Sequence, residues 1–132
     1  GLVDAHTHLT QALGKALALQ PDSAFLQHQL GLWLTRHDQH EYALLAFSRA
    51  VELQPDDPDY RYALALTLHQ LEQVEAAQKQ LETVLNRQPA NRKARVLLIQ
   101  YWKETGQLQN VQVLLAELER LNPDDPILQQ GL

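Results

Sequence analysis

The sequence contains no cysteine, and this absence removes several kinds of chemistry at once. Without a thiol, the chain can form no disulfide, no cysteine nucleophile and no sulfur-rich metal site. A chain without cysteine suits reducing and oxidising compartments equally, so the cytoplasm and the periplasm both stay open. Methionine is absent as well, even at position 1. We therefore expect the chain to be a processed or excised part of a longer protein.

Long apolar runs and an excess of positive charge are also missing. No hydrophobic stretch approaches the roughly 18 residues that a membrane-spanning helix needs. The N-terminus lacks the basic start and apolar block of a signal peptide. The formal net charge is −5, whereas nucleic-acid binding needs a concentrated positive field. We therefore expect neither a membrane span nor a nucleic-acid partner.

The N-terminal string Asp4-Ala-His6-Thr-His8 raises the question of a metal site. On a β-strand, His6 and His8 would share one face, as in the Asp-x-His-x-His motif of the amidohydrolase superfamily, which the string resembles. That superfamily uses a (β/α)₈ barrel of about 250 residues, and this chain has 132. On a helix the two side chains would point about 200° apart. We therefore expect the string to bind no metal.

A second group of histidines, His37 and His40 with Glu41, lies in the stretch RHDQHE. Zinc sites use three or four convergent ligands, so a polar turn between two helices explains this stretch better. The chain also has no Gly-x-Ser-x-Gly motif, no glycine-rich phosphate loop and no Walker motif. We therefore predict no enzyme activity, no metal site and no cofactor.

Prolines recur every 34 residues, at Pro21, Pro55, Pro89 and Pro123. Four prolines in strict register, in contexts as similar as ALALQPDS and AVELQPDD, indicate an internal repeat. Each repeat contains two stretches with apolar residues at intervals of three to four, as amphipathic helices have. No segment shows sustained period-two alternation, so we expect an all-α protein. Turns between the helices are predicted at 36–39, 71–73 and 105–107.

These repeats resemble those of the tetratricopeptide repeat family, whose unit is a pair of antiparallel helices. The first unit fits best, and it carries the family's residues at five positions, Gly31, Ala43, Phe47, Ala50 and Pro55. Other residues stand where the family has a tryptophan, namely Gln27, Arg61 and Arg95. The resemblance implies a right-handed superhelical array, or solenoid, with about three full repeats and a partial helix at each end.

The proline register divides a single predicted domain, residues 1–132, into parts. The three full repeats are 24–57, 58–91 and 92–125. Residues 1–23 are predicted to hold the second helix of a partial repeat, and 126–132 the start of a truncated first helix. We therefore expect the chain to be cut from a longer array. A further expectation is that copies of the chain self-associate through the truncated ends.

Individual residues predict how the helices begin and pack. Asp57 and Asp125 each precede a proline, which is typical of an N-cap followed by proline at the first helical position. Phe47 should be buried between helices. Ile99 stands where the family has a small residue, so we expect looser or altered packing near the C-terminal end. The register also predicts an apolar face for the N-terminal helix, formed by Leu9, Leu13, Ala16 and Leu19.

The resemblance implies a partner-binding groove lined by the first helix of each repeat. The family's groove positions correspond to Phe25, His28, Leu32, Arg36, Tyr62, Leu66, His69, Lys93, Val96, Gln100 and Lys103. Apolar and basic side chains together would suit a partly acidic peptide or helical segment of a partner protein. Because histidine titrates at about pH 6.5, His28 and His69 predict tighter binding of an acidic peptide at pH 6 than at pH 8.

We therefore predict a non-catalytic protein-interaction module, a scaffold that binds a segment of a partner. Two alternatives stay open: a structural or oligomerisation domain of a larger protein, and an accessory to a catalytic domain of the same parent. The amino-acid composition, rich in glutamine, alanine and leucine, is typical of a soluble bacterial protein. It is similar to the tetratricopeptide tails of periplasmic cytochromes and cytochrome-maturation factors. No Cys-x-x-Cys-His motif is present, so no haem can attach covalently.

Overall fold

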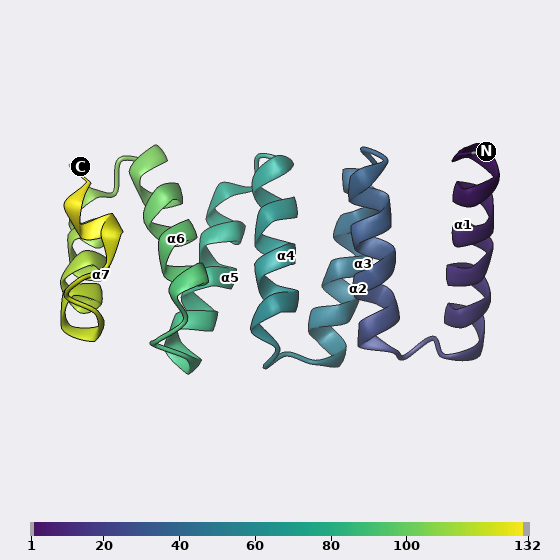
Figure 1. Ribbon diagram of the computed structural model, residues 1–132, viewed down its shortest axis with the longest axis horizontal. Helices are drawn as coiled ribbons and strands as arrows, with labels where there is room; N and C mark the ends of the chain where they lie inside the picture. The colour runs from purple at the N-terminus through teal and green to yellow at the C-terminus, as the bar shows by residue number, and fades with distance from the viewer. Residues whose placement is uncertain (1, 131–132) are drawn as a thin grey trace. The chain divides into compact units, whose positions relative to one another are not determined.

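The computed structural model describes the backbone of residues 2–130 and the side chains of residues 7, 8 and 10–130. Over this range the chain forms seven α-helices and one 3₁₀-helix and contains no strand (Figure 1). The elements are α1 (Leu2–Leu19), α2 (Ala24–Arg36), α3 (His40–Leu53), α4 (Pro58–Gln70), α5 (Val74–Arg87), α6 (Arg92–Glu104), α7 (Leu108–Leu121) and η1 (Pro126–Gln129). The prediction of an all-α fold is confirmed.

The helices form two compact units. Unit 1 spans Gly1–Gln73 and contains α1 to α4, and unit 2 spans Val74–Leu132 and contains α5 to η1. In unit 1, α3 packs against both α2 and α4; in unit 2, α6 packs against both α5 and α7. The single domain over residues 1–132 stays a prediction. No helix within residues 2–130 is long and apolar enough to cross a membrane.

The helix bounds follow the 34-residue register of the prolines. The helices α2, α4 and α6 begin at residues 24, 58 and 92, and we call them first helices. The helices α3, α5 and α7 begin at residues 40, 74 and 108, and we call them second helices. Side chains that are 34 residues apart in the sequence therefore occupy matching places on matching helices.

The first helices and η1 begin at N-cap residues that are themselves 34 positions apart. Ser23 and Asn91 each accept a hydrogen bond from the backbone N–H three residues later, at 3.2 and 2.9 Å. Asp57 and Asp125 accept from the backbone N–H two residues later, at 2.9 and 3.0 Å, and a proline follows each. The two predicted N-caps are confirmed. Such caps satisfy N–H groups that the first helical turn leaves unpaired.

Each first helix ends in the same turn. Asp38, Glu72 and Gly106 have φ angles of 59°, 63° and 73°, in the left-handed region. The residue after each of them donates its backbone N–H to the carbonyl five residues earlier, at 2.8 Å in all three turns. This is a Schellman motif, which closes a helix by satisfying its last carbonyl groups. The turns lie where the sequence predicted them, but only Gly106 has a side chain suited to that conformation.

Replacing Glu72 by glycine is expected to raise the free energy of unfolding by about 1 kcal/mol, because an L side chain in the left-handed region costs about that much. Urea denaturation monitored by circular dichroism measures the change. The matched control is Gly106→Ala, which should lower stability by a similar amount. A Glu72→Gly variant less stable than the wild type would contradict this backbone conformation.

The core of unit 1 contains a close approach between α2 and α3. Phe47 is 2% exposed, so its predicted burial is confirmed. A Cβ atom added at Gly31 would lie only 2.4 Å from Cε1 of the Phe47 ring. The ring of His28 packs nearby, with its centroid 5.4 Å from that of Phe47. Glycine is therefore required at position 31 for α2 to lie against this aromatic ring.

In unit 2, Ile99 occupies the position that corresponds to Gly31. Its side chain is buried. The contact between α6 and α7 is smaller than that between α2 and α3. This agrees with the looser helix pairing that Ile99 predicted, because a β-branched side chain keeps two helices further apart than glycine does.

The apolar face predicted for α1 is largely uncovered. Leu19 is 83% exposed, Leu13 and Ala16 are partly exposed, and the side chain of Leu9 lies outside the described residues. Within the described side chains, the predicted apolar face is therefore only partly covered. The reason is that α1 has its main contact with a single helix, α2.

An ion pair ties η1 to the start of α6. The Arg92 Nε and Nη2 atoms donate to the Asp125 carboxylate at 2.7 and 2.9 Å, and this carboxylate is fully buried. The hydrogen bond from Arg92, followed by that from the backbone N–H of Ile127, lowers the pKa of Asp125 to about 2. The pair therefore stabilises the fold above about pH 4, and this contribution is lost as the pH falls toward 2.

Candidate functional site

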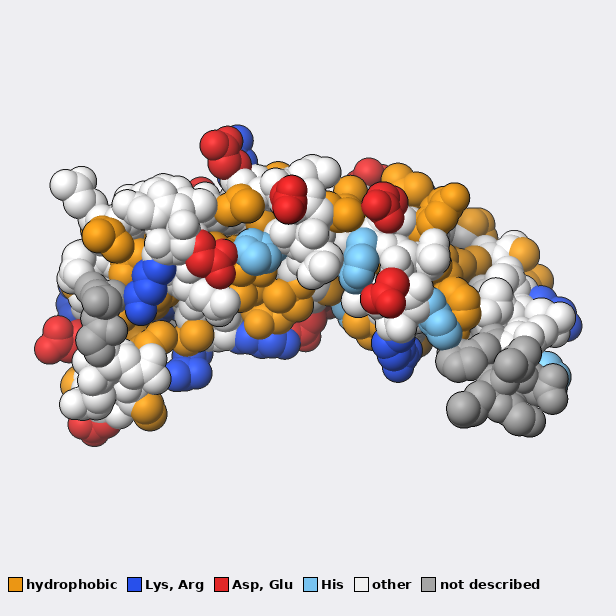
Figure 2. All heavy atoms as spheres, turned by 90° about the horizontal axis from the view of Figure 1, so that it is seen from above, with side chains coloured by type: hydrophobic (Ala, Val, Ile, Leu, Met, Phe, Trp, Pro, Cys, Tyr) orange, Lys and Arg blue, Asp and Glu red, His pale blue; other side chains and the backbone are white. Residues whose placement is uncertain are grey.

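The first helices of unit 1 expose large apolar side chains. Phe25 on α2 is 60% exposed and Leu66 on α4 is 44% exposed, while Leu32 and Tyr62 are half-buried. Arg36 adds an exposed positive charge at the end of α2. We call these five residues the first-helix face of unit 1. Hydrophobic side chains that reach the molecular surface are orange in Figure 2.

His28, which the sequence placed on the groove wall, is half-buried and packs against aromatic rings. Its ring centroid lies 4.8 Å from that of Tyr60 on α4, so the rings join α2 to α4. Its Nδ1 atom is buried and has no hydrogen-bond partner within the described part of the chain. Burial lowers the pKa of His28, and the carboxylates of Asp57 and Asp59 oppose this shift only in part. His28 therefore becomes charged at a lower pH than the ordinary pKa of 6.5, and the predicted pH dependence of peptide binding stays a prediction.

The lowered pKa of His28 makes the stability of the fold depend on pH. In the unfolded chain His28 takes up a proton at about pH 6.5, whereas the half-buried ring of the folded chain stays neutral to lower pH. The stabilising contribution of the neutral ring is therefore present above about pH 6.5 and is lost as the pH falls through the folded-state pKa. We expect the urea midpoint of the wild type to fall more between pH 7.5 and pH 5.5 than that of His28→Leu.

His8 provides the control for this experiment, because its side chain is exposed on α1. His8→Gln should follow the wild-type pH dependence. The same pH dependence in wild type and His28→Leu would show that His28 is not held neutral by burial.

The remaining predicted groove residues lie on α4 and α6. His69 is half-buried in the last turn of α4. On α6, in unit 2, Lys93 and Gln100 are exposed, and Val96 and Lys103 are half-buried. The structure therefore brings the predicted residues together as two sets, one within each unit.

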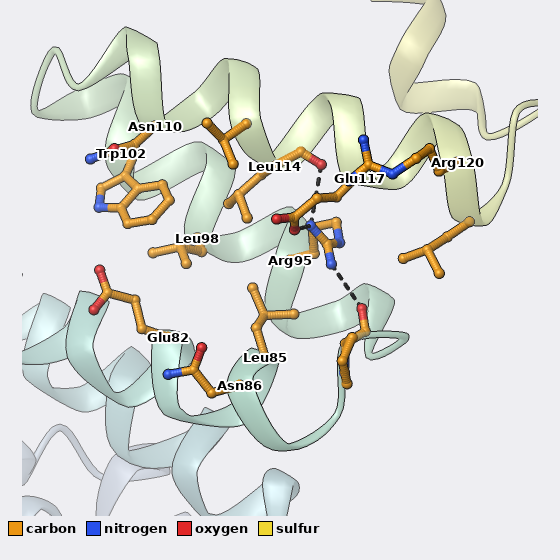
Figure 3. Close-up of a pocket in the computed structure, with 13 residues that line it drawn as sticks. Glu82, Leu85, Asn86, Arg95, Leu98, Trp102, Asn110, Leu114, Glu117 and Arg120 are labelled. Carbon is orange, nitrogen blue, oxygen red and sulfur yellow. Dashed lines mark hydrogen bonds and ion pairs between the residues drawn. The ribbon is translucent and has the colours of Figure 1, made fainter.

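Each unit also has a groove that the sequence did not indicate. In unit 2, a groove of about 670 Å³ lies between α5 and α7 and has α6 as its floor (Figure 3). In unit 1, a groove of about 650 Å³ lies over α2 and α3. The two have matching linings, because Leu34 and Leu45 of one correspond to Trp102 and Val113 of the other, two repeats later. We call them the second-helix grooves.

Arg95 lies at the floor of the unit-2 groove, where the family has a tryptophan. Its side chain is 2% exposed, and Nη1 donates to the Glu117 carboxylate at 2.7 Å and to a backbone carbonyl of α7 at 3.2 Å. Nη2 donates to the carbonyl of Pro89 at 2.8 Å. Arg61, one repeat earlier, donates in the same way to the carbonyl of Pro55, at 2.8 Å. Arginine at this position therefore fixes the proline turn to the first helix.

The histidine side chains that the structure describes show no metal-binding arrangement. Among the side chains that the structure describes, no three or more from histidine, cysteine, aspartate and glutamate are placed to hold a metal ion. The ring of His37 packs against Trp33, with 4.2 Å between centroids, and His40 is half-buried. The backbone around His8 is helical, which excludes the strand interpretation, and the side chain of His6 lies outside the described residues.

A model of the tetratricopeptide repeat family matches residues 44–131. This match covers well over half of the chain, so the protein belongs to the tetratricopeptide repeat family. The family and the fold support a general role as a protein-interaction scaffold. No curated protein sequence matches the chain.

Solved structures of MamA share the fold. A crystal structure of MamA has a TM-score of 0.75 at 16% identity, covering 86% of this chain and 66% of that chain. A MamA structure from Desulfovibrio magneticus RS-1 has a TM-score of 0.75 at 20% identity, covering 91% and 68%. Another MamA crystal structure has a TM-score of 0.79 at 18% identity, covering 96% and 69%. The chain thus spans about two thirds of the length of these proteins, and such identities establish the fold alone.

Proposed function

We propose that the protein is a non-catalytic interaction module that binds a segment of a partner protein on the first-helix face of unit 1. The observation that carries this proposal is the exposure of Phe25 and Leu66, which come from two neighbouring first helices. Large apolar side chains that are exposed together mark surfaces at which partners dock.

The apolar side chains set the affinity of this face, and its charge sets the preference for a partner. Full burial of a phenylalanine or leucine side chain contributes about 1.5–3 kcal/mol, whereas an exposed ion pair contributes about 0–1 kcal/mol. Phe25 and Leu66 therefore provide most of the binding free energy, and Arg36 favours an acidic neighbour. The partner segment is an apolar peptide or helix with some carboxylates, as the sequence predicted.

Affinity capture from cells of the source organism tests this proposal with matched variants. Leu66→Ser should lose the partner that the wild-type protein recovers, because the substitution removes an apolar contact from the first-helix face. Leu45→Ser is the control, since Leu45 is an equally apolar side chain on second helix α3 and is 68% exposed. Loss of the partner with Leu45→Ser, and its retention with Leu66→Ser, would place binding elsewhere.

A further inference from the structure

The second-helix groove of unit 2 has apolar walls and an apolar floor. Leu98 and the half-buried Trp102 of α6 form much of its floor, and Leu85 of α5 lines the opposite side. On α7, Val113 and Leu121 line the groove and remain more than half exposed. The groove therefore leaves apolar surface in contact with water, and this surface would be covered by a docked partner.

Two unpaired charges flank this apolar surface. Figure 3 shows Glu82 at the Trp102 end of the groove and Arg120 at the other end. Within residues 7, 8 and 10–130, neither side chain forms an ion pair or hydrogen bond. The other two charged residues in the lining, Arg95 and Glu117, form an ion pair with each other. The groove thus presents a negative end and a positive end separated by apolar side chains.

We propose that this groove is a second docking site, which takes an amphipathic helix of a partner protein. The apolar side of that helix lies on Trp102, Val113 and Leu121. A basic side chain at one end of the helix pairs with Glu82, and an acidic side chain at the other end pairs with Arg120. Helices with anchors at spacings of three, four and seven residues dock in apolar grooves of this kind.

A helical occupant fits the groove better than an extended one. A buried backbone needs partners for its N–H and C=O groups, and a helix satisfies most of these groups internally. The buried donor in the groove, Arg95, already makes its hydrogen bonds to Glu117 and to two backbone carbonyls. An extended peptide pressed onto these walls would therefore leave backbone groups unpaired.

The unit-1 groove does not share this charge arrangement. The residues that match Glu82 and Arg120 two repeats earlier are Gly14 and Glu52, and neither lines the unit-1 groove. The charged residues that do line it, Asp22 and Arg49, pair with each other at 2.9 Å. The preference for oppositely charged ends therefore belongs to unit 2. The proposal adds a site to the interaction role, and it does not depend on the first-helix face of unit 1.

Two synthetic helical peptides of about 14 residues, the length of α7, test the proposal. Both carry leucines on one side; one has lysine at one end and glutamate at the other, and the second has lysine at both ends. Fluorescence anisotropy of the labelled peptides should show that the wild-type protein binds the lysine–glutamate peptide about three- to fivefold more tightly. Arg120→Glu should reverse the preference, and Lys15→Glu, the same charge change at an exposed lysine on α1, should leave it unchanged.

Trp102 reports the place of binding, because the chain has only two tryptophans. In a Trp33→Phe background, the lysine–glutamate peptide should change the Trp102 emission. The proposal would be overturned if neither peptide bound, if both bound equally well, if Arg120→Glu left the preference unchanged, or if Trp102 emission stayed constant. None of these results would affect the capture experiment with Leu66→Ser, so failure of this site and failure of the first-helix face can be told apart.

Discussion

Replacing Phe47 by alanine is expected to lower the free energy of unfolding by about 3–5 kcal/mol. The ring is 2% exposed and lies against both Gly31 and His28, so its removal leaves a cavity that the rigid helix pair cannot close. A loss of this size is a large share of the 5–15 kcal/mol that typically stabilises a domain. Urea denaturation measures it. Tyr42→Ala, an exposed aromatic on the same helix, is the control and should change stability by less than about 0.5 kcal/mol.

The contact between Gly31 and Phe47 also predicts a non-additive pair of substitutions. Gly31→Ala should destabilise by about 1–3 kcal/mol, although alanine favours a helix over glycine by about 1 kcal/mol. In Gly31→Ala combined with Phe47→Ala, the new methyl group enters the space that the ring has left. The double variant should therefore lose less stability than the sum of the two single losses. Additive losses, or a small loss in Phe47→Ala, would contradict the packing of α2 on α3.

Replacing Glu117 by alanine is expected to cost about 3 kcal/mol, because it leaves the guanidinium of Arg95 buried without its counter-charge. We place the loss at the lower end of the usual range because the Glu117 side chain is 39% exposed, which lets water reach the ion pair. Chemical denaturation of the purified variant measures the loss. The same experiment on Glu119→Ala, a change to an exposed carboxylate on the same helix, should give a difference below about 0.5 kcal/mol.

A double variant separates the charge from the packing in this pair. Arg95→Met with Glu117→Leu removes both charges and fills similar space, and such replacements of buried ion pairs are often close to neutral. The double variant should therefore be more stable than Glu117→Ala alone. If Glu117→Ala were as stable as the wild type, the buried position of the Arg95 guanidinium would be wrong.

The sequence predicted the fold well because its signals are local. The prolines, the N-caps at Asp57 and Asp125 and the turn at Gly106 each act over a few residues, so their spacing alone gives the order of the helices. Asp38 and Glu72 adopt the same left-handed turn as Gly106, although neither side chain favours it. There the surrounding helices impose the conformation, and only the register of the repeat could indicate it.

The candidate site was harder to predict, because exposure and burial depend on neighbours that are distant in sequence. His28 occupies a groove position of the family, yet its ring packs against Phe47 and Tyr60, and this partial burial lowers its pKa. Three helices line the second-helix groove of unit 2 and two line that of unit 1, so no single stretch of sequence describes either groove. The exposed apolar side chains Leu45 and Val113, at matching places on α3 and α7, were the signal that could have indicated these grooves.

Photo-crosslinking in the source cells tests most directly whether the first-helix face of unit 1 binds a partner. A photoreactive phenylalanine analogue is placed in separate variants at Phe25, Leu66 and Leu45, and the crosslinked products are separated by size and identified by mass spectrometry. We predict that the same partner protein is crosslinked from the positions of Phe25 and Leu66 and that none is crosslinked from the position of Leu45. Crosslinks from the Leu45 position without any from the Phe25 and Leu66 positions would contradict binding at this face.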